Sequence, residues 1–326
     1  MRKSGFLFCI LVQLGVASAF AEPLHEEEAD WLKIMSFAAH KTDYSGVFFY
    51  QSGGRVEMSR ITHVSDETGE HERLEELGGR KSELIRNNDQ VWLHVDGRKV
   101  RVEKRQIRRA FPSLLPEQIS TLKENYLVAK EEEDEVAGYP VRAVVFQPRD
   151  NLRYTRKMWA HNDSGLLLKA AVMDDRGSVI EQYAFMQLNI SVNIDRKWIT
   201  QDKPFPAEIV QQPQLSAVSK AEPVIEATGW QVDALPSGFK KILEMHRPIR
   251  ENKDPVIHMV FSDGLAGISV FIEKVNGFAL PQSGLSGQGA VHVYNRIVGE
   301  HLVTVVGEVP PLTVIQVGDS VRYAGQ

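Results

Sequence analysis

The sequence holds a single cysteine, Cys9, and that cysteine lies inside an apolar N-terminal segment. Arg2-Lys3 precedes the apolar run 6–16, and Ala19-Phe20-Ala21 follows it, which is the pattern of a secretory signal peptide. The run is shorter than the roughly 20 residues of a membrane-spanning helix. We therefore expect a signal peptide over residues 1–21, cleavage after Ala21, and a mature chain without cysteine in the periplasm of a Gram-negative cell.

A chain without cysteine can form no disulfide, no thiol nucleophile and no lipid-modified N-terminal cysteine. An excess of positive charge is also missing, because the formal net charge is -5, and this argues against general nucleic-acid binding. Beyond the leader, no stretch is long and apolar enough to span a bilayer. The composition indicates a protein that is exported in soluble form.

The common catalytic motifs are absent as well. The stretch HERLE departs from the zinc motif HExxH, because Glu75 stands where the second histidine is needed. The stretch SGLSGQG around Ser286 misses GxSxG by one position and is typical of a flexible loop. No glycine-rich phosphate loop is present. We expect no enzyme, no cofactor and no metal site, while a triad built from distant residues stays open.

Four prolines mark a boundary in the second half of the chain. They fall among Gln, Ser and Glu between Lys203 and Ala227, a composition typical of a semi-rigid linker. About 180 residues precede this segment and about 100 follow it, and both lengths suffice for a hydrophobic core. We predict a first domain over 22–202, a proline-rich linker over 203–227 and a second domain over 228–326.

The first domain is predicted to consist mostly of antiparallel strands. Trp31 and Met35 lie at helical spacing and indicate an N-terminal helix, and a second helix is expected to start near Pro116. Short turn sequences at 52–54, 96–97, 162–165 and 174–177 separate apolar runs and predict hairpins. One run, Leu166–Met173, is apolar on both sides of the pleat, whereas a strand with one dry face alternates.

The predicted fold class is α+β. We expect a large curved antiparallel sheet, a half-open barrel covered by helices, followed by a smaller α+β C-terminal domain. An ordinary two-layer core and a ligand cavity both explain the two-sided apolar run. In the second domain, turns at Asp263-Gly264 and at 295–300 predict hairpins, and Val314, Val317 and Val321 are spaced as in a short helix.

Several stretches resemble known families. MWAHNDSGLLLKAAVMDDRGSVIEQYAF, residues 158–185, resembles the tryptophan–turn–leucine–turn pattern of the LolA/LolB lipoprotein carriers. YSGVFFYQSGGRVEMSRITH, residues 44–63, is similar to the opening of the MucB/RseB family of sigma-E regulatory proteins. The similarity continues in GWQVDALPSGFK, FSDGLAGISVFIE and HVYNRIVGEHLVTVVGEVPP of the second domain. The chain is thus identified as a member of the MucB/RseB family, with a LolA-like first domain.

The resemblance implies a regulator. Members of the family bind the periplasmic part of a membrane-spanning anti-sigma factor, chiefly through the second domain, and shield it from the site-one protease of the envelope-stress pathway. They release it on sensing mislocalised lipoprotein or lipopolysaccharide, and in relatives that control exopolysaccharide the circuit governs alginate. The alternative is a periplasmic lipid or lipoprotein carrier. The oligomeric state, a homo-oligomer included, stays open.

A lipid-sensing first domain requires a cavity for the acyl chains of lipoprotein or lipopolysaccharide. We expect its lining among apolar residues of the predicted strands. The candidates are Phe49, Trp92, Leu93, Met158 and Leu168.

A basic run between Arg98 and Arg109 reverses the sign of an otherwise acidic chain. We take part of it as a contact for an anionic partner, either lipid-A phosphates or acidic residues of the anti-sigma factor. A solvated strand face explains the same charges equally well. The candidates are Arg101, Arg105, Arg108 and Arg109.

Overall fold

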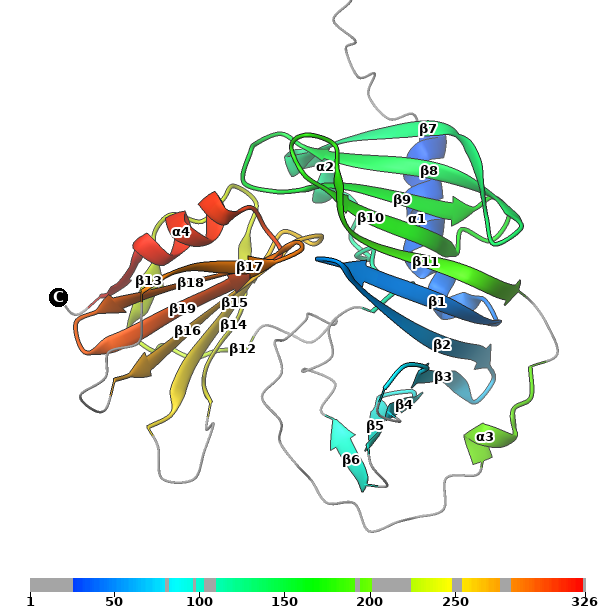
Figure 1. Ribbon diagram of the computed structural model, residues 1–326, viewed down its shortest axis with the longest axis horizontal. Helices are drawn as coiled ribbons and strands as arrows, with labels where there is room; N and C mark the ends of the chain where they lie inside the picture. The colour runs from blue at the N-terminus through cyan, green and yellow to red at the C-terminus, as the bar shows by residue number, and fades with distance from the viewer. Residues whose placement is uncertain are drawn as a thin grey trace, which may run out of the picture.

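The computed structural model describes residues 26–79, 82–95, 98–102, 110–190, 194–200, 224–247, 254–275 and 283–324. Its strands form two separate main sheets, and each sheet has its own hydrophobic core (Figure 1). The predicted signal peptide, with its cleavage after Ala21, and residues 203–223 of the predicted linker lie outside the described residues.

The first sheet has 11 strands in the order β6-β5-β4-β3-β2-β1-β11-β10-β9-β8-β7, counted over the described part of the chain. Every pairing in it is antiparallel. Its strands are β1 (Tyr44–Ser52), β2 (Arg55–Asp66), β3 (Gly69–Glu76), β4 (Ser82–Asn87), β5 (Gln90–Val95), β6 (Arg98–Val102), β7 (Tyr126–Val136), β8 (Tyr139–Pro148), β9 (Thr155–His161), β10 (Leu167–Met173) and β11 (Val179–Ile190).

Two meanders, β1 to β6 and β7 to β11, are joined along β1 and β11 in the middle of this sheet. The edge strands β6 and β7 do not pair with each other, so the sheet is not closed into a barrel. The hairpin predicted at 52–54 is confirmed, since Ser52 lies opposite Arg55 across Gly53 and Gly54, both at positive φ. The hairpin predicted at 96–97 is confirmed by the pairing of β5 with β6, although its two turn residues lie outside the described residues.

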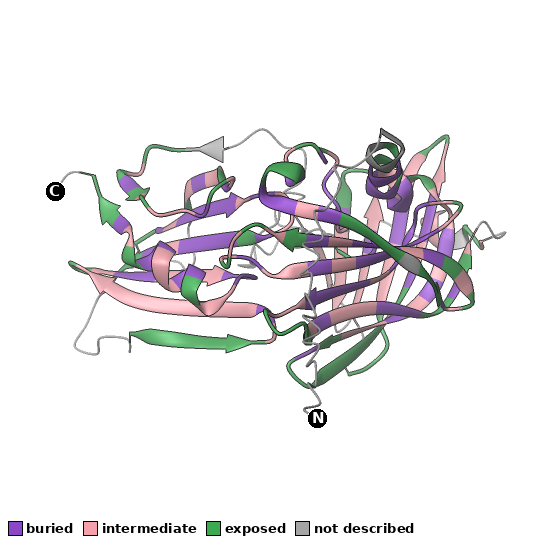
Figure 2. Cartoon of the chain, turned by 90° about the horizontal axis from the view of Figure 1, so that it is seen from above, coloured by how far each residue is buried: buried purple, intermediate pink, exposed green. Residues whose placement is uncertain are grey.

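One face of the sheet, here called the inner face, is covered by helix α1 (Glu26–Lys41). Residues directly opposite each other in register share a face, which places Met158, Val144, Ala170 and Tyr183 on this side. The buried side of α1, with Trp31 and Leu32, belongs to the same core (Figure 2).

The second predicted helix was largely wrong. Only α2 (Leu122–Asn125) is helical, and residues 110–121 form successive turns that bury Phe111, Leu115 and Ile119 in the core of the first sheet. Pro112 and Pro116 disfavour a helical backbone only at the residues before them, because the first turn of a helix tolerates proline, so they exclude a helix up to residue 115 but not over 117–121. The sheet is therefore covered by one helix and an irregular segment.

The two-sided apolar run of β10 has a structural explanation. Ala170 and Val172 bury against the inner face, while Ala171, only 3% exposed, points to the opposite, outer face. On that outer face Trp159 lies opposite Lys169, and the Nζ atoms of Lys157 and Lys169 lie 4.8 and 4.3 Å from its ring centroid. An indole with two lysine stems thus covers the outer side of β10.

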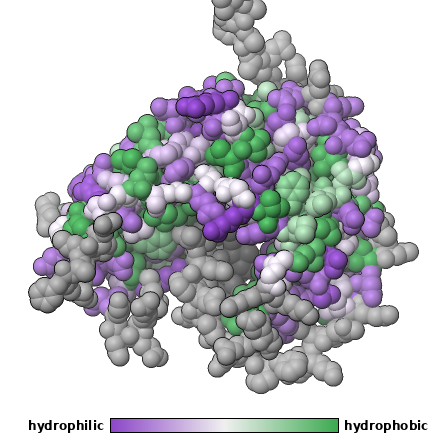
Figure 3. Space-filling view, viewed as in Figure 1, coloured by the Kyte–Doolittle hydropathy of each residue, from purple (hydrophilic) through white to green (hydrophobic). Residues whose placement is uncertain are grey.

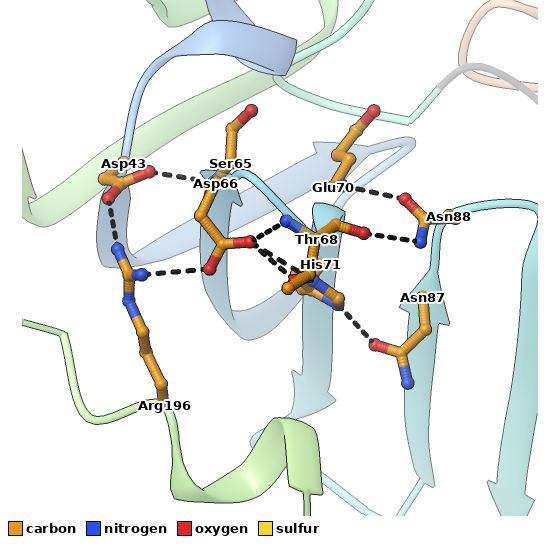
Figure 4. A network of polar contacts seen from close by, with 9 residues as sticks. All are labelled: Asp43, Ser65, Asp66, Thr68, Glu70, His71, Asn87, Asn88 and Arg196. Atoms are coloured by element: carbon orange, nitrogen blue, oxygen red, sulfur yellow. Dashed lines mark hydrogen bonds and ion pairs between the residues drawn. The ribbon is translucent and has the colours of Figure 1, made fainter.

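A short polar network fixes the end of β2 and β3 (Figure 4). Arg196, next to α3 (Lys197–Thr200), contacts Asp66 at 2.9 Å and Asp43 at 3.2 Å. Asp66 also accepts hydrogen bonds from the backbone and hydroxyl of Thr68, which lower the pKa of its carboxyl. Because Arg196 is about half exposed, this network contributes little free energy and mainly positions the segment after β11.

The second main sheet has the order β12-β14-β15-β16-β19-β18-β17 and a separate strand pair β13-β20. Its elements are β12 (Val224–Ile225), β13 (Trp230–Val232), β14 (Lys240–Arg247), β15 (Val256–Ser262), β16 (Gly267–Lys274), β17 (Gly284–Gln288), β18 (Val291–Val298), β19 (His301–Gly307), α4 (Pro311–Asp319) and β20 (Val321–Tyr323). Both predicted hairpins of this domain are confirmed, β15–β16 and β18–β19.

Two details differ from the sequence expectations. Val224 and Ile225, placed in the linker by their proline-rich context, form β12 and pair in parallel with β14, so they belong to the second sheet. Val314 and Val317 are buried on α4 as expected, but Val321 lies beyond the helix in β20. The helix ends at Asp319 and the chain then turns to pair with Trp230, Gln231 and Val232.

Candidate functional site

The most elaborate polar arrangement lies between the two domains. The loop that joins β8 and β9 carries Arg153, and the turn between β15 and β16 begins with Asp263. Arg153 Nε donates to Asp263 Oδ2 over 2.6 Å, and both side chains are fully buried. The hydroxyl of Tyr126, at the start of β7, donates to the same carboxylate oxygen over 2.8 Å.

Each partner in this cluster is held by its own domain as well. The other oxygen of Asp263 accepts from the backbone N–H groups of Leu265 and Ala266, at 3.0 and 2.8 Å. Arg153 also donates to Asp150 within its own loop and to the carbonyl oxygen of Ser237 across the interface. Its guanidinium lies 5.0 Å from the ring centroid of Phe239. Within its own domain, Asp263 is thus held by two N–H groups and Arg153 by Asp150, while Ser237 and Phe239 contact Arg153 from the second domain.

The electrostatics of the cluster define its charge state. Burial, and then the charge of Asp263, raise the pKa of the Tyr126 hydroxyl well above its ordinary value, so tyrosine stays a neutral donor. Burial alone would lower the pKa of Arg153, but its hydrogen bond to Asp263 and the charge of that carboxylate raise it. The interface therefore holds a charged pair with a neutral donor beside it.

A second ion pair crosses the interface close by. Arg156 on β9 donates to Glu308 over 3.2 Å, and both residues are buried. The Thr313 hydroxyl at the start of α4 donates to the carbonyl oxygen of Leu152 over 2.9 Å. The loop 149–154 and the start of β9 thus supply most of the first domain's polar contacts to the second.

Glycines allow close approach at two further points. Gly289, at φ +58°, faces Ser52 so closely that a Cβ atom there would lie 1.9 Å from the Ser52 hydroxyl. Gly238, at φ +79°, is packed against Asn125 in the same way, with a Cβ atom 2.0 Å from its amide nitrogen. A larger residue at either position would be strained at its positive φ and would require the facing side chain, Ser52 or Asn125, to move.

The five candidate cavity residues do not share one surface. Met158 and Leu168 are 1% and 0% exposed and belong to the inner core. Phe49 lies in one row of opposite residues with Ala184, Lys169 and Trp159 on the neighbouring strands. Since Trp159 lies on the outer face, Phe49 points to the outer face as well.

Trp92 and Leu93 are half-buried neighbours on β5 and therefore point to opposite faces. Figure 3 shows apolar side chains gathered on the outer face over β11 and β1, where Met58 and Met186 are exposed. A cavity on either face of the sheet would therefore be lined by only some of the five candidates.

Of the four basic candidates, only the backbone of Arg101 belongs to the described part of the chain. Arg101 lies on β6, and nothing is described of its side chain, while Arg105, Arg108 and Arg109 lie outside the described residues. The chain reappears at Ala110, which is exposed, and Phe111 then packs on the inner face against Phe48 and Tyr183, with ring centroids 5.1 and 5.5 Å apart. In the sequence, Arg109 therefore stands two positions before a residue of the first domain's apolar core.

Sequence reasoning missed the interdomain cluster. Asp263 was read only as a turn residue, and Arg153 and Tyr126 carried no motif. Tyr126 and Arg153 lie 137 and 110 residues from Asp263, so no local pattern could join them.

The described residues hold no group of three or more His, Cys, Asp or Glu side chains suited to a metal ion. Over the same part of the chain, helices of the length and apolarity required to cross a membrane were not found.

Comparisons with known families match both domains in order. The family model of the MucB/RseB N-terminal domain matches residues 27–203, and that of the MucB/RseB C-terminal domain matches residues 224–322. The sigma factor AlgU regulatory protein MucB of Pseudomonas aeruginosa is 29% identical over 321 residues, covering 96% of each chain. The sigma-E factor regulatory protein RseB of Haemophilus influenzae is 24% identical, covering 94% of this chain and 93% of the relative.

Solved structures give the same result. The crystal structure of MucB in complex with the periplasmic part of MucA matches with a TM-score of 0.68 and 28% identity, covering 90% of this chain and 98% of that one. The Pseudomonas aeruginosa MucA/MucB complex matches with a TM-score of 0.69 at the same identity and the same coverage of both chains. A structure described as MucB alone matches with a TM-score of 0.59 and 27% identity, covering 92% and 98%.

Proposed function

The chain belongs to the MucB/RseB family, since models of both domains match it in order, and from this premise we propose that it is a periplasmic regulator of an envelope-stress sigma factor. In this role it binds the periplasmic part of a membrane-spanning anti-sigma factor and shields that part from the site-one protease. The two-domain match to MucB in complex with MucA is the observation that carries the proposal.

The architecture suits a binding role. The buried cluster around Arg153 and Asp263 holds the two domains against each other, which suits a partner that contacts both. The named relatives are regulatory proteins rather than enzymes, which agrees with the lack of a catalytic motif in the sequence. A lipid or lipoprotein carrier remains the second candidate, and the second domain favours the regulator because carriers of the LolA class lack it.

The proposal extends to the signal that ends the shielding. Mislocalised lipoprotein or lipopolysaccharide combines acyl chains with an anionic head group. The first domain offers an apolar core that includes Phe111, and its sequence places the basic residues Arg101, Arg105, Arg108 and Arg109 shortly before Phe111. Binding there would release the anti-sigma factor to the protease, and in a relative that controls exopolysaccharide the same step governs alginate.

A protection assay tests the central claim. The mature protein is mixed with the periplasmic segment of its anti-sigma factor, site-one protease is added, and intact segment is followed over time. We expect cleavage to slow as the protein saturates the segment, because the bound segment is withdrawn from the protease. A peptide substrate that lacks the binding segment controls for direct inhibition of the protease. Unchanged cleavage at saturation would refute the proposal.

A further inference from the structure

The charged groups of the domain interface have partners on both sides of it. Without the second domain, Arg153 keeps Asp150, and without the first domain, Asp263 keeps the N–H groups of Leu265 and Ala266. Polar contacts of this kind can separate without leaving a buried charge unpaired. The interface also contains an apolar contact, since Leu265 packs against the first core, and this contact favours the closed arrangement.

Arg156 has a second carboxylate, Glu181, nearby on its own domain. In this structure it pairs with Glu308 of the second domain. On the first sheet, Arg156 and Glu181 both lie directly opposite Val172, one from β9 and one from β11. They share the inner face and are two strand spacings of about 4.8 Å apart, a span that the two side chains bridge together.

Glu181 is anomalous in the arrangement described here. It is 4% exposed, and its Oε2 atom has no hydrogen-bond partner among the residues that the structure describes. A buried carboxylate oxygen without a donor destabilises the state in which it occurs. Arg156 is a buried donor that lies opposite the same residue, Val172, on the same face of the sheet. In this structure its guanidinium pairs with Glu308 of the second domain.

We propose that Arg156 is the exchanging member of a domain clamp, defined by Arg156, Glu181 and Glu308. When the domains are closed, Arg156 pairs with Glu308 and Glu181 stays unpaired. When they separate, Arg156 turns along the inner face and pairs with Glu181. The chain then has two domain arrangements, and one ion pair is exchanged between them. The link to partner binding rests on the proposed function, whereas the clamp itself does not.

The clamp predicts opposite effects for its two carboxylates. Glu308→Gln removes the partner of the closed state and raises the population with separated domains. Glu181→Gln removes the unpaired charge from the closed state and the partner from the separated state, so it raises the closed population. We expect each change to shift the ratio of the two arrangements by about tenfold, in opposite directions.

Distances between spin labels measure this ratio. Labels are placed by Asp163→Cys and Glu300→Cys, two exposed turn positions away from the interface, in the mature protein. The distance distribution is recorded for the labelled parent, Glu308→Gln, Glu181→Gln and the double variant, which should return towards the parent. Glu131→Gln, which breaks the pair with Lys157 on the outer side of the same strand β9, is the matched control and should change nothing.

If Glu181→Gln leaves the distribution unchanged or shifts it in the same direction as Glu308→Gln, the clamp is wrong. Glu181→Leu provides a second neutral variant with the same expectation, and circular dichroism verifies that each variant is folded. The measurement needs no partner, so its failure leaves the protection assay untouched. If Glu308→Gln and Glu181→Gln shift the distances in opposite directions but the protein does not slow cleavage in the protection assay, the clamp is supported and the regulatory role is rejected.

Discussion

Arg153 and Asp263 lie 110 residues apart in the sequence and meet between the two domains, with Nε and Oδ2 separated by 2.6 Å and no side-chain exposure on either. Tyr126 donates to the same oxygen, so one carboxylate neutralises the arginine and satisfies the hydroxyl. Removing that carboxylate would leave both donors buried without an acceptor of equal strength.

We therefore expect Asp263→Asn to lower the free energy of unfolding by about 3 kcal/mol, because a fully buried arginine loses one of its two carboxylate partners and keeps only Asp150. Urea unfolding measured by circular dichroism checks this value. The control is Asp233→Asn, whose pair with Arg322 is about half exposed on both sides and should cost less than about 0.5 kcal/mol. If both substitutions lower the free energy of unfolding equally, the buried interdomain pair contributes no more to stability than an exposed pair.

A second prediction concerns pH and His258. Burial, and then the charge of Arg247, lower the pKa of His258 from 6.5 to about 4. In the unfolded chain His258 is therefore protonated below about pH 6.5, whereas in the folded domain it stays neutral down to about pH 4. The free energy of unfolding decreases as the pH falls through this window. At pH 5 the loss is about 2 kcal/mol.

Replacement of His258 by Phe should remove this part of the pH dependence. The new ring can still stack on Phe271, whose centroid lies 4.3 Å from that of the histidine. Unfolding free energies at pH 7 and pH 5 provide the measurement. The exposed His246 is the control, and His246→Phe should keep the parent's slope. A His258→Phe protein as acid-sensitive as the parent would contradict the assignment.

The sequence predicted what depends on neighbouring residues. The hairpins at Gly53-Gly54 and Asp263-Gly264 were found because turn residues between apolar runs act locally. The helix expected to start near Pro116 forms only over Leu122–Asn125, where one helical turn packs in the core and residues 110–121 contribute irregular backbone instead. The pair of Arg153 with Asp263 could not be predicted, since a polar contact between distant loops leaves no periodic pattern.

The candidate cavity gives a third prediction. If acyl chains enter the first domain, we expect them on the inner face, where each buried CH₂ contributes about 0.8 kcal/mol. Met158→Ala should then weaken binding of a fluorescent fatty acid, whereas Phe49→Ala, on the outer face, should leave it nearly unchanged. Titration of the probe into each folded variant gives the dissociation constants. The reverse order would place the lipid on the outer face, and no fluorescence gain with the parent would exclude acyl binding.

The last prediction concerns the basic cluster. Arg105, Arg108 and Arg109 lie directly before Phe111, which is buried on the inner face, so a head group bound there would lie beside chains bound to that face. Replacing all three with Gln should weaken release of the anti-sigma segment by lipopolysaccharide while basal binding of the segment stays nearly the same. The salt dependence of lipopolysaccharide binding should also fall, because fewer charges remain to be screened. The control replaces three exposed bases elsewhere, Lys33, Lys123 and Arg176. Lipopolysaccharide can release the segment only if it binds the free regulator more tightly than the complex. If the triple variant loses binding of the anti-sigma segment while its response to lipopolysaccharide is unchanged, the cluster belongs to the partner interface instead.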